Sequence, residues 1–461
     1  MNKCLILFYL LFISLNYSNN NFENSLVFNF IKSDTTKYLF LDNRIIKQTF
    51  NVKLEVGKVE KHPNNPLFTE DKEWEMRFDN LYGNVIFDKD EKIYKLWYSP
   101  FIVDSKNVIK EIDTITSNYA PPPIREMGIC YATSKDGINW KKSDLGLVRY
   151  NGNKNNNIVW RRPHGAGIFK DYSEKDPEKL YKVIYKHNQE WNWGLGNGNE
   201  GNSLAVGFSA DGLNWSDKIN IMDLPGDTHN NANWIPNLDK YVAMTRDWVD
   251  VDGKEKKQRA VIRIESNDFI KWENPKQVLV GQNFNLQTYA MPYFFYEGVY
   301  LGLVAIHDQK SDRVWTELAW SPDTINWTRI DVGNPLIPNS EIKLDYDYGC
   351  VYACAAPIIK KDKIEIFYGS SDYRHNGWRN GSFSMATLRT DGFAGYKQIN
   401  AKKEGVIITQ NIKYNKGLLK INADFNDTGS LKVTVLNKKG KEIAISKTIK
   451  KTSMNQIVQF D

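Results

Sequence analysis

The amino-acid sequence predicts an all-β protein, a five-bladed β-propeller followed by a small C-terminal β-sandwich. Three observations lead to this prediction. A seven-residue frame, Ser-x-Asp-x-apolar-(Asn/Lys)-Trp, begins at residues 134, 209, 266 and 321. Runs that alternate apolar and polar residues, as β-strands do, lie between the copies. The 461 residues are 41% apolar and 13% aromatic, which fits a soluble globular chain of two or three domains and excludes a disordered or membrane-spanning one.

Each copy of the frame is predicted to form a hairpin turn. In Ser134–Trp140, the Asp136 carboxylate can accept turn amides, Gly137 supplies a positive φ, and Trp140 opens the returning strand. A degenerate fifth copy occupies residues 390–393. The Asp and Trp residues of the repeat are therefore predicted to be structural, and the alternating runs exclude a helical solenoid.

The N-terminus has the pattern of a secretory signal peptide over residues 1–18, with one Lys, an apolar run from Cys4 to Leu15 and a polar exit. The run is too short to span a bilayer. We therefore expect an exported protein, secreted or periplasmic, with no membrane insertion after cleavage. Residues 19–69 form an N-terminal segment in which 38–42 and 52–56 have the pattern of strands.

Residues 70–397 contain five units, each with a first strand rich in small or aromatic residues and a second strand holding Tyr or Trp. Four strands per unit, repeated five times, indicate a five-bladed propeller, whose innermost strands crowd around an axis and favour small residues. The predicted first strands are 82–88, 165–169, 231–235, 289–294 and 351–356, and the second strands are 93–98, 180–185, 240–244, 300–304 and 364–368.

The composition changes after residue 397 to short Lys- and Asn-rich strands at 405–408, 417–422 and 430–436, with a hairpin turn at 437–440. We interpret residues 398–461 as a small β-sandwich or half-sandwich, which strands near residues 38–56 could complete.

Cysteine and charge give weaker indications. Cys350 and Cys354, four apart on a predicted strand, would lie about 13 Å apart and could not pair, so we interpret them and Cys130 as buried apolar residues. The formal net charge of +6 comes from Lys-rich loops. It permits an anionic polysaccharide partner, and export argues against nucleic acid.

The Ser-x-Asp-Gly-x-x-Trp hairpins and the five units resemble the glycoside hydrolase propellers of the furanosidase type, families 43, 32 and 117, over about residues 70–461. Residues 131–140, 145–147, 156–159 and 387–393 are also similar to a group of secreted bacterial proteins described as glycosyl-hydrolase-like. The resemblance implies that an oligosaccharide or polysaccharide substrate binds at one mouth of the axial channel. First strands begin there, and the loops after second strands return there.

Candidate site residues follow from those positions, and five of the six histidines of the chain occur among them. The candidate catalytic residues are Asp79, His164, Asp227, His229 and Asp347. The candidate substrate-binding residues are Arg77, Trp97, Arg162, His187, Glu190, Arg246, Gln287, His307, Asp372, Arg374 and His375.

Glycosidic bond cleavage through an oxocarbenium-like transition state needs one ionised carboxylate and one proton donor. Resemblance to the furanosidases puts the carboxylate at the start of the first unit, where Asp79 lies. Asp227 has the position in the third unit where most of these families have a Glu acid. The resemblance to family 117 implies a histidine acid instead, His229 or His164, with a pKa tuned by Asp227 or Asp347.

Each candidate has a simpler structural alternative. Asp79 and Asp227 could cap turns, and Trp97 could be core rather than a platform for a sugar ring. The arginines could be solvated or paired with carboxylates. If they face the mouth, they would suit a carboxylate or sulfate on the sugar.

Three functions therefore stay open. The first is an exported glycoside hydrolase acting by acid/base chemistry on plant or algal polysaccharide fragments, with an anionic sugar as one option. The second is a non-catalytic carbohydrate-binding propeller, and the third is a metal-dependent lyase or hydrolase that uses the channel histidines. No cofactor is required for the first. Calcium or another divalent ion on the axis stays open, although no closely spaced His pair supports a metal site.

Overall fold

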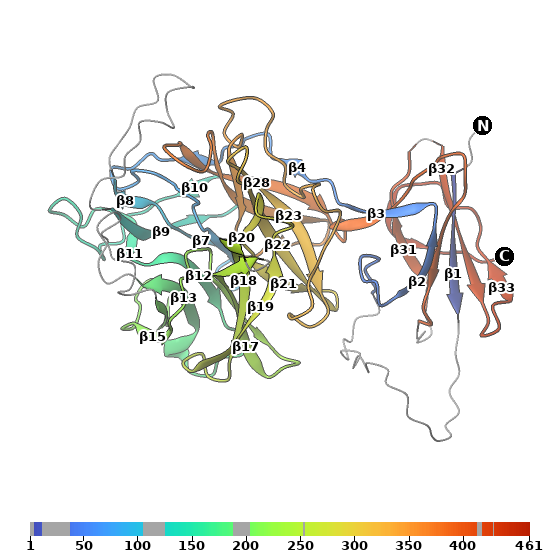
Figure 1. The fold of residues 1–461 in the computed structure, drawn as a ribbon, viewed down its shortest axis with the longest axis horizontal. Helices are drawn as coiled ribbons and strands as arrows, with labels where there is room; N and C mark the ends of the chain where they lie inside the picture. The colour runs from blue at the N-terminus through green and yellow to red at the C-terminus, as the bar shows by residue number, and fades with distance from the viewer. Residues whose placement is uncertain are drawn as a thin grey trace. The chain divides into compact units, whose positions relative to one another are not determined.

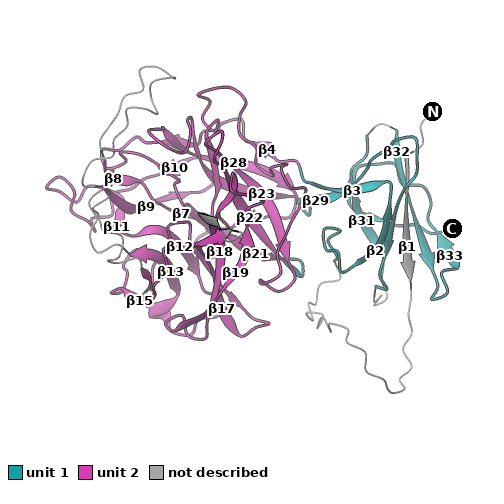
Figure 2. Cartoon of the chain, viewed as in Figure 1, with its two compact units in different colours: residues 1–57, 296–299, 390–461 teal, residues 58–295, 300–389 magenta. Residues whose placement is uncertain are grey.

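The computed structural model describes residues 4–11, 37–104, 125–187, 203–251, 254–412, 417–426 and 428–461. In this part of the chain, all regular structure is β-strand apart from one turn of 3₁₀-helix, Pro177–Lys179 (Figure 1). The described residues include no helix that is long and apolar enough to cross a bilayer. The chain divides into a larger unit, residues 58–295 and 300–389, and a smaller unit, residues 1–57, 296–299 and 390–461 (Figure 2).

Five antiparallel meanders make up the larger unit, in chain order. The first contains β6 (Asn84–Asp88), β7 (Ile93–Tyr98), β9 (Glu126–Ser134) and β10 (Trp140–Lys141), with β8 (Phe101–Val103) and β11 (Ile158–Arg161) also paired to β9. The second contains β12 (His164–Lys170), β13 (Tyr181–His187), β14 (Ser203–Ser209) and β15 (Ile219–Met222). The third contains β16 (Asn231–Ile235), β17 (Lys240–Val251), β18 (Lys254–Ser266) and β19 (Trp272–Val280).

The fourth and fifth meanders depart in detail from the pattern that the sequence predicts. The fourth contains β20 (Leu286–Ala290), β22 (Val299–Asp308), β23 (Arg313–Ser321) and β24 (Thr328–Arg329), with β21 (Tyr293–Tyr296) also on β22. The fifth contains β25 (Cys350–Ala353), β27 (Lys363–Ser371) and β28 (Gly381–Arg389), with β26 (Ile358–Ile359) on β27. Its outer edge is paired by β4 (Glu60–Lys61) and β5 (Phe68–Thr69) from the N-terminal side. An unpaired edge is thereby avoided.

Hydrogen bonds of 2.8–3.0 Å join each meander to the next and the fifth to the first, so the five form a closed series. The donor and acceptor residues are Asn84 and Ala166, Asn230 and Gly165, Thr228 and Tyr289, Val314 and Gly349, and Ala355 and Gly83. Most of the donor groups lie at, or just before, the start of a first strand. The residues just before those strands are consequently brought together.

Close approach of the first strands explains their small residues. Gly165 has φ +58°, and a Cβ atom at this position would lie 1.7 Å from the Thr228 carbonyl oxygen. No side chain fits at that distance, and left-handed φ is itself costly for residues other than glycine.

The repeated frame forms hairpins, as the sequence predicts. The Ser134 hydroxyl accepts the Gly137 amide at 2.9 Å, and Asp136 Oδ1 accepts the amides of Ile138 and Asn139 at 2.8 Å each. Asp211, Asp268 and Asp323 accept the equivalent pairs of amides. These contacts confirm that the Asp residues of the repeat are structural.

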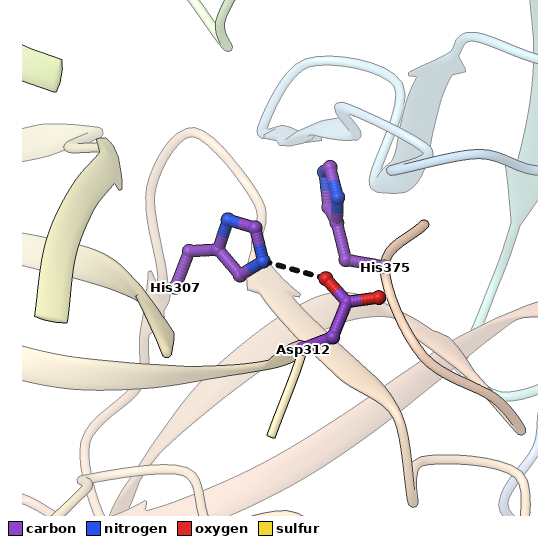
Figure 3. A group of neighbouring side chains, drawn as sticks. All are labelled: His307, Asp312 and His375. Atoms are coloured by element: carbon purple, nitrogen blue, oxygen red, sulfur yellow. Dashed lines mark hydrogen bonds and ion pairs between the residues drawn. The ribbon is translucent and has the colours of Figure 1, made fainter. Parts of the chain in front are cut away.

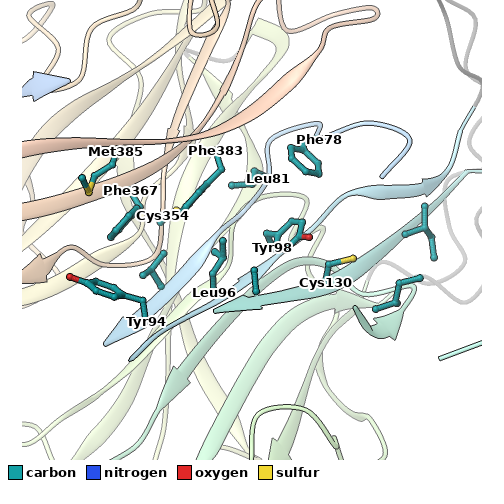
Figure 4. Packing of buried hydrophobic residues seen from close by; sticks show 14 residues of the cluster. Phe78, Leu81, Tyr94, Leu96, Tyr98, Cys130, Cys354, Phe367, Phe383 and Met385 are labelled. Atoms are coloured by element: carbon teal, nitrogen blue, oxygen red, sulfur yellow. The ribbon is translucent and has the colours of Figure 1, made fainter. Parts of the chain in front are cut away.

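A buried cluster links the first and fifth meanders, where Leu96 and Tyr98 pack near Phe367 and Phe383 (Figure 4). All three cysteines of the larger unit are buried and unpaired, as predicted. Cys130 and Cys354 belong to this same cluster.

The smaller unit contains a five-stranded sheet in the order β2, β30, β1, β32, β33. Residues of the predicted signal segment form β1, which pairs in parallel with β30 and β32. Export and cleavage stay predictions. The strands are β1 (Cys4–Leu11), β2 (Ile46–Phe50), β30 (Gly405–Thr409), β32 (Gly429–Leu436) and β33 (Glu442–Ile445), with two further pairs, β3 (Val52–Val56) with β29 (Ala394–Gln398) and β31 (Lys420–Ala423) with β34 (Ser453–Ile457).

The closed series makes a stability difference between two glycines testable. Gly146 also has a positive φ, +70°, but a Cβ atom there would meet nothing within 4 Å. We expect Gly146→Ala to lower the free energy of unfolding by about 1–2 kcal/mol from φ strain alone. Gly165→Ala should cost about 1–3 kcal/mol more, because its Cβ overlaps the Thr228 carbonyl. Urea unfolding of both variants measures this, and equal losses would contradict the close approach.

Candidate active site

Two carboxylates, Asp79 and Asp227, lie just before the first strands of the first and third meanders and remain partly exposed, at 18% and 28% of their side chains. Both lie close enough to the buried tyrosines Tyr82 and Tyr289 to act on them electrostatically. Burial raises the pKa of each tyrosine, and the negative charges of Asp227 and Asp79 raise it further. The structure thus brings together two of the predicted catalytic residues that are 148 positions apart in the chain (227 minus 79).

Arginines hold Asp79 in its ionised form. Arg379 Nη2 lies 2.8 Å from Asp79 Oδ1, and Arg77 Nη2 lies 3.4 Å from the same oxygen. Burial alone would raise the pKa of Asp79, but the charges of Arg379 and Arg77 outweigh it and hold the pKa well below its ordinary value. Arg77 also contacts the Asp104 carboxylate, which contacts Arg125 as well.

Asp227 bridges a histidine and an arginine. Its Oδ1 lies 2.7 Å from His164 Nε2, and its Oδ2 accepts a 2.6 Å bond from Arg246 Nη2. Burial opposes ionisation of Asp227, but Arg246 and His164 hold its pKa well below the ordinary value. His164 is 4% exposed, so Asp227 is the member of the pair that reaches solvent.

His229 lies deeper than the carboxylates and is buried against Tyr82 at a ring-centroid distance of 5.5 Å. Its Nε2 lies 3.2 Å from Asn84 Oδ1. Burial lowers the pKa of His229 to about 3. The imidazole is therefore neutral near pH 7, which does not suit the predicted role of proton donor.

A cationic aromatic wall lies beside the carboxylates. The guanidinium groups of Arg246 and Arg259 lie 4.9 and 5.1 Å from the Tyr289 ring centroid and also over Trp248. Arg259 Nη1 donates to Gln287 Oε1 at 2.9 Å, which places two more predicted binding residues, Arg246 and Gln287, around Tyr289.

The predicted residues His307 and His375 also pack on Tyr289, at ring-centroid distances of 6.0 and 5.0 Å. Figure 3 shows them together with Asp312, whose Oδ1 lies 2.9 Å from His307 Nε2. Nine predicted residues thus lie in clusters that meet at Tyr82 and Tyr289: Arg77, Asp79, His164, Asp227, His229, Arg246, Gln287, His307 and His375.

Other predicted residues lie elsewhere. Asp347 is fully buried, pairs with Lys61 Nζ at 2.6 Å and accepts from Tyr368, which corrects its assignment to the catalytic group. Trp97 is fully buried and donates to the Gly212 carbonyl at 2.7 Å, so it is core and not a platform for a sugar.

The remaining predicted binding residues have local partners or solvent around them. His187 Nε2 lies 2.6 Å from Lys218 Nζ, and Asp372 accepts two bonds from Asn380. Arg162 and Arg374 are exposed. Glu190 lies outside the described residues.

The sequence did not indicate two residues of the site. Arg379 pairs with Asp79, and Asp312 contacts His307 and His375. Arg379 lies in the loop between β27 and β28 that also carries Asp372, Arg374 and His375, so its place in that loop was a usable signal. Asp312 lies in the short turn between β22 and β23, where an aspartate reads as a turn residue.

An axial divalent ion stays a prediction. His229 Nε2 contacts the Asn84 amide oxygen, which also accepts the Ile168 amide. Among the described residues, the group of three or more His, Cys, Asp or Glu side chains close enough to share an ion is His307, Asp312 and His375.

No family model and no curated protein matches the chain. Among solved structures, it is similar to an N-acetylgalactosamine deacetylase from F. plautii in complex with blood group B trisaccharide (13% identity, 72% of this chain and 95% of that one, TM-score 0.47). It is also similar to a beta-1,2-mannobiose phosphorylase from Listeria innocua (13%, 72% and 96%, 0.47) and to a thermostable family-43 glycoside hydrolase (12%, 74% and 95%, 0.43). These likenesses are to carbohydrate-active enzymes, and at TM-scores below 0.5 they establish no activity for this chain.

The depressed pKa of His229 has a consequence for acid stability. Below about pH 6.5, His229 is protonated in the unfolded chain, but in the folded chain it stays neutral down to about pH 3. Burial of the neutral imidazole therefore contributes fully to the unfolding free energy above pH 6.5, and this contribution falls by about 1.4 kcal/mol per pH unit below it. We expect wild-type protein to lose about 2 kcal/mol more unfolding free energy than His229→Gln between pH 7 and pH 5. Parallel losses in urea titrations would contradict the burial of a neutral imidazole.

Proposed function

We propose that this protein is an exported glycoside hydrolase whose larger unit is a five-bladed β-propeller. The closed series of five meanders supports the propeller. The observation that carries the function is the pair of partly exposed carboxylates around Tyr82: Asp79 through Arg379 and Asn80, and Asp227 through His164. A hydrolase of this class needs one anion to act at the anomeric carbon and a proton source for the leaving oxygen.

Asp79 is the proposed base or nucleophile. Arg379 and Arg77 keep it deprotonated at any physiological pH, and an anion is required to remove a proton from water or to bond the anomeric carbon. Its 18% exposure leaves a route for substrate. The two arginines also hold the Asp79 carboxylate in one orientation, as a group that acts on the anomeric carbon requires.

The His164–Asp227 pair is the proposed proton source. Asp227 alone does not suit this role, because its pKa lies well below the ordinary value. In this proposal the imidazolium form of His164 gives its Nε2 proton across the 2.7 Å bond to Asp227, Asp227 passes it to the leaving oxygen as the glycosidic C–O bond breaks, and His164 is left neutral. Water then supplies the hydroxyl group to the sugar, and its proton restores the pair through Asp79 or solvent.

The cationic aromatic wall of Arg246 and Arg259 favours binding of a sugar that carries a carboxylate or sulfate. Among the described residues, Arg259 has no carboxylate partner, and its buried Nε has no hydrogen-bond acceptor. A planar guanidinium group binds such anions through two parallel hydrogen bonds. A uronic acid or sulfated sugar would supply the missing acceptors.

Carboxamide substitutions separate a hydrolase from a carbohydrate-binding protein. Asp79→Asn and Asp227→Asn should each lower kcat/KM on the hydrolysed oligosaccharide by about 10²–10⁴, because each removes a group that moves a proton or bonds carbon. Oligosaccharide affinity should persist. Product analysis of an oligosaccharide screen and calorimetry measure both quantities.

The matched control is Asp347→Asn, which removes a buried carboxylate bonded to Lys61 and should lower stability without a comparable loss in turnover. Binding of oligosaccharides with no product from the wild-type protein would replace the hydrolase with the carbohydrate-binding alternative.

Arg259→Met tests the class of sugar. The variant keeps the apolar contact with Trp248 but loses the charge, so we expect binding of a uronic or sulfated oligosaccharide to weaken about 10–100-fold while its neutral analogue is little affected. Arg149→Met, on an exposed arginine, is the control. Equal losses for charged and neutral sugars would contradict an anion-binding role.

A further inference from the structure

A second chemical site lies beside the carboxylates, formed by His307 at the end of β22, Asp312 in the turn after it, and His375 in the loop after β27 (Figure 3). The ligand atoms of the three side chains all lie within 4.8 Å of one another. The two imidazole rings lie 4.4 Å apart at an interplanar angle of 39°. Three potential ligands from two meanders thus face one small volume.

The backbone holds this arrangement in place. The His375 amide donates to the Asp312 carbonyl at 2.8 Å, and the Asn376 amide donates to Asp312 Oδ2 at 2.8 Å. The Asn376 side chain donates to Asp312 Oδ1 at 2.9 Å. The loop that carries His375 is therefore attached to the turn that carries Asp312, and the carboxylate is oriented before any ligand arrives.

His307 has the second partner that ligating histidines usually have. Its Nε2 faces Asp312, while its Nδ1 lies 2.7 Å from the Gln309 amide group. In protein metal sites the nitrogen that does not bind metal is commonly hydrogen-bonded, which fixes the ring and the tautomer. With Nε2 on an ion, the proton moves to Nδ1 and the Gln309 oxygen can accept it.

We propose that His307, Asp312 and His375 bind a divalent transition-metal ion of the Zn²⁺ class. Two imidazoles and one carboxylate suit zinc and its neighbours, whereas calcium and magnesium require mostly oxygen ligands. Bonds of about 2.1 Å at a tetrahedral angle place ligand atoms about 3.4 Å apart. The present separations must therefore close by no more than about 1.4 Å, which rotation of the His375 side chain can supply.

Three protein ligands leave at least one coordination position open, as in catalytic zinc sites. Tyr289, which packs on both imidazoles, accepts a 3.4 Å contact from Asn80 Nδ2, and Asn80 follows Asp79 directly. The open position is available to water or to an anionic oxygen. This inference does not depend on hydrolysis by Asp79 and Asp227.

The full-length chain, stripped with EDTA and transferred to chelator-free buffer, is titrated with ZnCl₂ by calorimetry. We expect one Zn²⁺ per chain and a rise in the unfolding temperature. Loss of the orienting amide in Asn376→Ala should weaken affinity about 10–100-fold, and loss of a ligand in Asp312→Asn or His375→Gln should weaken it at least as much. His187→Gln, at a histidine that contacts Lys218 instead, should leave it unchanged.

Asp312→Asn is nearly isosteric, and circular dichroism verifies that it folds. The proposal is overturned by the absence of saturable Zn²⁺ binding to the wild-type chain, or by equal affinity in wild type, Asp312→Asn and His375→Gln. It is equally overturned if CaCl₂ saturates the protein and ZnCl₂ does not.

Discussion

The structure depends on the hydrogen bonds that run between the beginnings of the first strands. Thr228 donates to the Tyr289 carbonyl across the third and fourth meanders, and Asn84 donates to the Ala166 carbonyl across the first and second. These bonds require backbones to approach within the space of a missing Cβ, as at Gly165. The candidate site is a consequence of the same constraint, because His164 begins β12, and Asp79 and Asp227 lie in the segments that lead into β6 and β16.

Charge compensation decides what the site can do. Asp79 is only 18% exposed, and this loss of water alone would raise its pKa, but the charges of Arg379 and Arg77 outweigh the effect. Asp227 is compensated by Arg246 and His164. Both carboxylates are thus anionic at neutral pH, so the proposed hydrolysis needs a proton from another group, and His164 is the histidine bonded to Asp227. The arginines therefore set the division of roles as much as the aspartates do.

Local patterns were predictable from the sequence, and contacts between distant segments were not. The Ser134 and Asp136 hairpin is fixed by bonds within a few residues, so its frame is visible in the sequence. The positions of Asp79, His164 and Asp227 followed from counting strands. Asp347 has an equivalent place in the fifth meander, but Lys61 from β4 captures its carboxylate. That pairing joins segments almost 290 residues apart (347 minus 61), and no local sequence motif predicts it. The burial of Trp97, which donates to Gly212 of the next meander, was not predictable for the same reason.

Tyr289 ties the separate clusters into one site. Its ring contacts Arg246 and Arg259 as well as His307 and His375. Its hydroxyl group meets Asn80, whose side chain also bonds Arg379 at 2.9 Å and the Tyr82 hydroxyl at 2.7 Å. A buried aromatic ring is rigid because its neighbours occupy the space around it. The distance between the His307, Asp312 and His375 group and the two carboxylates is therefore set by packing on one side chain. If both proposals hold, a ligand that contacts the two groups at once would have to match that spacing.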